Sequence, residues 1–202
     1  MVSFSAKDLC TRSCMQIKMF RERPELKPQP TENQKKGNEF QSQIAKRFSN
    51  VIGEEMGGCL QHENMLIYFS NDIICQDKII EVKSVDKNRE FSDWYLQSSF
   101  LQCAIYKTLT HYCKNFLKTA SFHVKNGNKY MECCMSDRTP FLLYMGENIY
   151  QIHVLNYEPI LKFILNKAKS TLNWNDAKSF DTKYKQKEYQ TLKNYFTVNK
   201  LY

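Results

Sequence analysis

The chain has few of the features that mark membrane proteins or secreted, disulfide-stapled proteins. None of its apolar runs approaches the roughly 18 residues that a membrane-spanning helix needs. The first residues are interrupted by Lys7, Arg12 and Lys18 and lack the apolar core of a signal peptide. Its eight cysteines include no C-x-x-C pair, which argues against a zinc site. We therefore expect free thiols, no membrane partner and an intracellular, reducing compartment, which for a viral chain would be the host-cell cytoplasm.

Internal repeats and long low-complexity tracts are also absent, and 202 residues with 42% hydrophobic content predict one domain. The net charge of +8 is unevenly spread: residues 1–36 carry +4, residues 37–159 carry −2 and residues 160–202 carry +6. Basic ends attract phosphate backbones, although solubility alone would also explain them. We divide the chain into a basic N-terminal arm or linker (1–36), a core (37–158) and C-terminal helices packing on the core (159–202).

The hydrophobic periodicity predicts helices and strands in alternating groups. Apolar stripes predict helices over residues 38–52, 94–113 and 160–169, and a basic helix is predicted over 176–199. Strands are predicted at 65–69, 120–124, 130–135 and 149–155, and a hairpin over 70–84. The strands at 120–124 and 130–135 are expected to pair across a turn at 126–128. This order predicts an α/β or α+β fold, with a mixed central sheet flanked by helices and an extra basic helix at the C-terminus.

The hairpin places two carboxylates together. If Gln76 and Asp77 form its turn, Asp72 lies opposite Glu81, and Lys83 points to the same face. Like charges directly opposite each other destabilise a sheet, so this pair needs a cation or a raised pKa. A divalent metal with oxygen ligands, Mg²⁺ or Mn²⁺, satisfies that need.

The pattern resembles the PD-(D/E)xK nuclease superfamily, which has a helical glutamate, then an aspartate, then Glu-x-Lys on the next strand. Here these are Glu39, Asp72, Glu81 and Lys83, with Asn71 in place of the usual proline. The RecB-like and lambda-exonuclease-like branch adds Gln-x-x-x-Tyr on the following helix, which is matched by Gln102 to Tyr106. The resemblance implies a restriction-endonuclease-like core.

The resemblance also implies residue roles. Asp72, Glu81, the backbone carbonyl of Val82 and Glu39 would hold the metal. Lys83 would orient or deprotonate the attacking water and neutralise developing charge. The side chains expected to brace the site or contact the nucleic-acid backbone are Gln102, Tyr106, Arg47 and Gln43. An iron–sulfur cluster, present in some RecB-like nucleases, is not expected, because no cysteine follows Cys134.

Plainer interpretations stay open for each residue. Asp72, Glu81 and Lys83 can form a solvated salt bridge. Glu39 can simply complement the helix dipole, with Glu54, Glu55 or Glu63 as ligand instead. Gln102 can be a surface residue and Tyr106 a core aromatic residue.

The expected function is a Mg²⁺-dependent nuclease acting on DNA, as an exonuclease on single strands or duplex ends. The alternatives are a catalytically silent nuclease fold that binds nucleic acid within a larger assembly, and an endonuclease acting on RNA or DNA.

Overall fold

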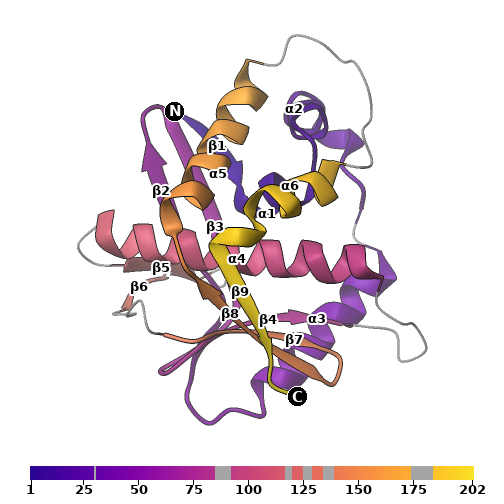
Figure 1. Cartoon of the computed structure of the whole chain (residues 1–202), viewed down its shortest axis with the longest axis vertical. Coiled ribbons are helices and arrows are strands. Elements are labelled where there is room, and N and C mark those ends of the chain that lie inside the picture. The colour runs from indigo at the N-terminus through magenta and orange to yellow at the C-terminus, as the bar shows by residue number, and fades with distance from the viewer. Residues whose placement is uncertain (30, 85–91, 117–119, 125–128, 134–138, 174–183) are drawn as a thin grey trace.

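The computed structural model describes residues 1–29, 31–84, 92–116, 120–124, 129–133, 139–173 and 184–202. These residues form a mixed α/β fold in which a mixed open sheet is flanked by helices. Figure 1 shows the long helix α4 (Asp93–Phe116) crossing the middle of the molecule, with the chain termini at opposite ends of the view.

The sheet is built mainly from antiparallel neighbours, with two parallel pairings. Its strand order is β6-β5-β2-β3-β4-β7-β8-β9, and β1 pairs with β3 beside this path. The parallel pairs are β1 with β3 and β4 with β7. The strands are β1 (Val2–Ser5), β2 (Val51–His62), β3 (Met65–Cys75), β4 (Ile79–Lys83), β5 (Ala120–Val124), β6 (Lys129–Cys133), β7 (Phe141–Met145), β8 (Asn148–Val154) and β9 (Phe196–Lys200).

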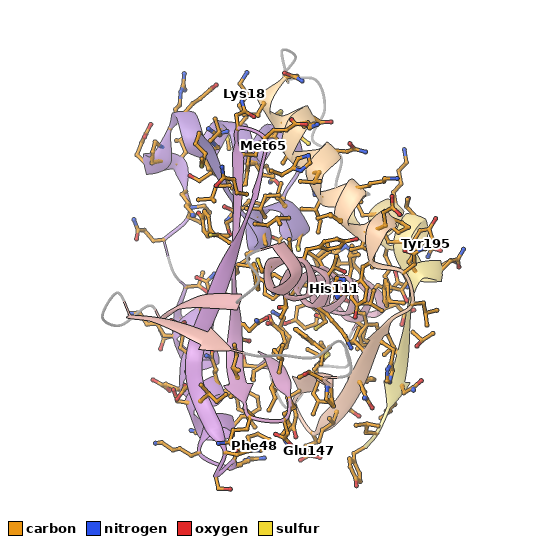
Figure 2. All side chains as sticks on the ribbon, turned by 90° about the vertical axis from the view of Figure 1, so that its left-hand side faces the viewer. Lys18, Phe48, Met65, His111, Glu147 and Tyr195 are labelled. Carbon is orange, nitrogen blue, oxygen red and sulfur yellow. The ribbon has the colours of Figure 1, made fainter. Side chains whose placement is uncertain are left out.

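Two apolar clusters cover the two faces of the sheet around the predicted hairpin. The larger cluster joins Ile74 and Ile79 to α4, α5 (Tyr157–Leu172) and the N-terminal helix α1 (Ala6–Thr11). The smaller one joins Ile73, Ile80 and their neighbours to α3 (Glu32–Ala45). In Figure 2, α4 is seen almost end-on between the β2–β3 strands and the α5 and β9 side, with His111 labelled on it. Because side chains alternate along a strand, the hairpin presents one face to α4 and the other to α3.

The N-terminal segment predicted to be a basic arm belongs to the folded core. β1 pairs with the start of β3, and α1 and α2 (Cys14–Glu22) follow. A capping box starts α2, in which Ser13 accepts from the Gln16 N–H and the Gln16 side chain accepts from the Ser13 N–H. Phe4, Leu9 and Ile17 are buried in the larger cluster, so this segment contributes apolar area as well as charge.

Two predicted helices have the wrong extent. The helix predicted over 38–52 starts earlier and ends earlier, because Thr31 and Gln34 form a capping box at Glu32 and the chain enters β2 at Val51. The basic helix predicted over 176–199 is only the short α6 (Tyr184–Leu192) in the described residues. After it, the alternating segment Phe196–Lys200 becomes β9 and pairs with β8.

The other predicted elements are confirmed. The central helix, the helix from Tyr157 to Leu172 and the 65–69 strand are present, the last as part of the longer β3. β5 and β6 pair antiparallel as expected, and β8 covers the strand predicted at 149–155. The turn predicted at 126–128 lies outside the described residues. Within the described part of the chain, no helix is both long and apolar enough to cross a bilayer.

Gly57 in β2 sits so close to β3 that it cannot carry a side chain. An added Cβ would lie 1.7 Å from the carbonyl oxygen of Phe69, a backbone atom that cannot rotate away. We expect Gly57→Ala to destabilise the protein by about 2–3 kcal/mol in urea unfolding, because the two strands must separate. Gly37→Ala is the matched control: its Cβ would meet only the Ser84 Oγ at 3.2 Å, and alanine favours the surrounding helix. Equal losses for the two variants would contradict this account.

Candidate functional site

The hairpin register is the one predicted from the sequence. The Cys75 N–H donates to the Lys78 carbonyl at 2.9 Å across the Gln76-Asp77 turn, and Ile73 pairs with Ile80. Asp72 and Glu81 are the next positions in this register, on the face that α4 covers. The regular ladder stops there, because the Asp72 side chain replaces a backbone partner: its Oδ2 accepts from the Val82 N–H at 2.8 Å.

Glu81 is the buried centre of the site. Its side chain is almost fully buried, and its Oε1 accepts two hydrogen bonds: Lys83 Nζ donates at 2.6 Å and Gln102 Nε2 at 2.8 Å. Its second oxygen, Oε2, is also buried but accepts no hydrogen bond from the described residues. A buried carboxylate oxygen without a donor or a cation is energetically unfavourable, so this atom marks a place where a ligand would be stabilising.

Lys83 is the cation of this cluster. Burial favours its neutral form, but the carboxylates of Glu81 and Asp72 outweigh that effect and raise the pKa of the ammonium above its ordinary value. The lysine is therefore charged at neutral pH. Its side chain keeps 19% of its surface exposed, so it reaches from the buried carboxylate toward solvent.

Gln102 and Tyr106 are braces of the site from α4. Both side chains are buried, and the Gln102 Nε2 donates to Glu81 Oε1. Burial raises the pKa of Tyr106 well above its usual value, and the nearby Glu81 charge adds to this. Their predicted four-residue spacing thus places both on the face toward the sheet, where they orient Glu81 and do not reach the molecular surface.

The structure does not bring the predicted α3 residues to this cluster. Glu39, Gln43 and Arg47 are all exposed, whereas the buried side of α3 packs on the opposite face of the hairpin through Ile44 and Ala45.

The three glutamates considered as alternatives to Glu39 also have other surroundings. Glu54 accepts from Ser42, and Glu63 pairs with Lys169. Glu55 lies in β2 and has a φ of 50°. Among the described residues, no group of three or more His, Cys, Asp or Glu side chains is placed to hold a metal.

Gln41 is a site residue that the sequence reasoning missed. Its Nε2 donates to the Asp72 backbone carbonyl at 3.0 Å, from the α3 side of the sheet. The sequence does contain a signal for Gln41: it shares a helical stripe with Ile44 and Phe48, and a polar residue on an apolar stripe needs a hydrogen-bond partner.

Val82 has its side chain in the α3-side cluster, and its N–H donates to the Asp72 side chain. Its carbonyl remains a predicted ligand.

The donor set fits a hard divalent cation by chemical type. Magnesium is commonly held by one or two carboxylates with several waters and substrate phosphates completing its shell, and Asp72 and Glu81 are ligands of that type. Of the described histidines, His111 stacks on Tyr157. The buried Cys103 has its thiol pKa raised well above the usual value by burial and by the Glu81 charge, which disfavours the thiolate that would bind a metal. Six cysteines are free thiols: Cys10, Cys14, Cys59, Cys75, Cys103 and Cys113.

The protonation of Asp72 makes the site sensitive to pH. Burial and the Glu81 charge raise the pKa of Asp72 from 3.8 to about 7. Between these values the folded protein binds a proton that the unfolded chain has released, so stability falls as pH rises from about 4 to about 7 and stays low above that. In EDTA at pH 8 we expect Asp72→Asn to be more stable than wild type by at most about 4 kcal/mol, since one pKa unit corresponds to 1.36 kcal/mol.

Urea unfolding of the two proteins from pH 4 to pH 8 measures this effect. The stability difference between Asp72→Asn and wild type should grow through that interval and then level off. A difference that is constant with pH, or an aspartate protein that gains stability relative to the variant as pH rises, would contradict the raised pKa.

Comparisons of the chain with protein-family models, curated proteins and solved structures gave no significant match. The fold and the site geometry therefore carry the functional argument.

Proposed function

We propose that the chain is a metal-dependent nuclease that hydrolyses phosphodiester bonds of DNA at the Asp72–Glu81–Lys83 cluster. The observation that carries the proposal is the buried Glu81 Oε2, which lacks a hydrogen-bond donor among the described residues while a second carboxylate occupies the adjacent register position. Two acids with a single lysine are an unfavourable arrangement for a purely structural salt bridge. The same two carboxylates are well suited to bind a metal cation.

The order of the elements supports the nuclease-like interpretation of the fold. The upstream helix α3, the strand that bears the aspartate, the strand that bears Glu-x-Lys and the helix that bears Gln102 and Tyr106 follow one another in the predicted sequence. The two strands belong to a mixed sheet, and the two helices flank it. We propose on this basis a restriction-endonuclease-like core of the RecB-like type.

Each residue of the cluster has a distinct task in this proposal. Asp72, Glu81 and the Val82 carbonyl would hold Mg²⁺, which when bound supplies an activated water and neutralises charge on the phosphate. Lys83 stays protonated, so it orients the attacking water and stabilises negative charge and does not act as the base. Gln102 fixes the Glu81 Oε1 and directs the other oxygen toward the ligand, and the buried Tyr106 packs on the same face of α4 one turn further along.

One observation favours the alternative of a nucleic-acid-binding protein without catalysis: the third carboxylate predicted from the helix, Glu39, is exposed and completes no three-acid group with Asp72 and Glu81 in the described residues. A direct assay separates the two. Labelled single-stranded DNA, duplex DNA, RNA and a closed circle are incubated with the protein and Mg²⁺, Mn²⁺ or EDTA.

The nuclease proposal expects metal-dependent cleavage of DNA, and protection of the circle if the enzyme requires ends. Binding to these substrates without cleavage under either metal would favour the non-catalytic alternative. Cleavage of equal extent in EDTA would contradict a metal mechanism.

A further inference from the structure

The site lies in a fork of the sheet that the N-terminal segment helps to form. β2 pairs with β3 from Met65 to Cys75 and so occupies one whole edge of that strand. The other edge is shared: β1 pairs with its first part, up to Tyr68, and β4 pairs with Ile73 and Ile74. Residues 69–72 of β3 lie between these two partners. We call this interval the fork.

The chain leaves β1 toward the fork. β1 runs parallel to β3, with Ser5 beside Tyr68, so its end points in the direction of Asp72. The helix α1 begins immediately afterwards at Ala6, and Lys7 is its second residue. Lys83 and Glu81 are at the end of β4 on the opposite side of the same fork.

The helix α1 is held firmly in this position. Ala6, Leu9 and Cys10 are buried in the large apolar cluster. The carbonyl of Leu9 accepts a hydrogen bond from the buried ammonium of Lys167 on α5. Lys7 therefore projects from a fixed support, although its own side chain is exposed.

The positive charge of Lys7 is not neutralised by an acidic side chain of the described residues. The neighbouring Arg12 is neutralised by Asp8 at 2.7 Å, whereas Lys7 forms no ion pair with any described residue. Lys7 lies two residues beyond Ser5, at the end of β1 that runs toward Asp72. A fixed, exposed ammonium beside an acidic cluster, with no acid bound to it, is arranged to meet an incoming anion.

We propose that Lys7 is a phosphate-binding residue of this site, and that its ammonium contacts a non-bridging phosphate oxygen of a nucleic-acid strand lying in the fork. The inference rests on the proposed nuclease function and adds a substrate contact from the far wall of the site. Lys83 would face the reacting phosphate from β4, and Lys7 would hold the strand from the β1–α1 side. Such a contact positions the backbone without reading sequence.

The test measures binding separately from cleavage. A fluorescent single-stranded oligonucleotide is titrated in EDTA at several salt concentrations, with the Asp72→Asn protein as the cleavage-silent background. Adding Lys7→Ala should weaken binding about fivefold and reduce the slope of log K against log salt by about one contact. Lys7→Arg should retain both. Lys27→Ala, which removes an exposed charge from the same N-terminal segment, should change affinity less than about twofold.

The outcomes separate this inference from the nuclease proposal. If Lys7→Ala binds like its background, or Lys27→Ala weakens binding equally, the Lys7 contact is refuted even when the wild-type protein cleaves DNA. If the Lys7 effect is present but wild type cleaves nothing with Mg²⁺ or Mn²⁺, the contact stands and the nuclease function fails. Because Lys7 is exposed, the thermal unfolding of the variant should match its background, which confirms that binding is compared between folded proteins.

Discussion

Replacing Lys83 with methionine is expected to abolish cleavage and to destabilise the protein at the same time. The variant leaves the Glu81 and Asp72 carboxylates without their shared cation. Removing one partner of a buried ion pair costs about 3 kcal/mol or more, and loss of a charge-stabilising group lowers turnover at least about 100-fold. Urea unfolding at pH 8 and single-turnover cleavage measure the two effects.

Lys78→Met is the matched control for Lys83→Met. Lys78 lies on the same hairpin, where it pairs with the exposed Asp77 at 3.1 Å and lies over the Phe48 ring. Its removal should leave cleavage near the wild-type rate. A Lys83→Met protein that cleaves as fast as Lys78→Met would show that the cluster is not the reacting site.

Replacing Lys167 with methionine is expected to be the most destabilising single charge change outside the site. Lys167 Nζ donates to Glu188 Oε1 at 2.6 Å and to the Leu9 carbonyl, and both charged side chains are at most 4% exposed. The variant takes the Lys167 ammonium away from the buried Glu188 carboxylate, which should lower the free energy of unfolding by about 3–5 kcal/mol. It should also loosen α1, because the Leu9 carbonyl loses its donor.

A double variant isolates the cause of this loss. Lys167→Met with Glu188→Leu removes both charges and should recover most of the stability, since an apolar pair of similar volume often replaces a buried ion pair without loss. Lys162→Met on the same helix breaks the exposed Glu158 pair and should have little effect. A double variant no more stable than the single one would show that lost packing around Lys167, and not the loss of its ion pair with Glu188, explains the lower stability.

The sequence was sufficient for the hairpin because its information is local. Two short apolar runs joined by a two-residue turn fix the register, and the register brings Asp72 and Glu81 together. The Gln102–Tyr106 spacing was equally local, since residues four apart share a helix face.

The strands β1 and β9 and the orientation of α3 were not predicted, because each depends on contacts between residues far apart in the sequence. β1 is four residues long and is a strand because β3 offers it an edge, so the N-terminal segment appeared to be a basic arm. β9 follows a short helix, and only its partner β8 distinguishes it from a continuation of that helix. Glu39 was chosen by its place in a motif. Its orientation depends on which face of α3 packs on the sheet, and that face is set by Ile44 and Ala45.

The most direct test of the central claim is a crystal structure of the wild-type protein soaked in Mn²⁺, with anomalous scattering used to locate the metal. We expect an anomalous peak between the Asp72 carboxylate and the Glu81 Oε2, within coordination distance of both, and its loss in Asp72→Asn crystals. Ordered Asp72 and Glu81 side chains with no peak between them at saturating Mn²⁺ would contradict the metal site and the function built on it.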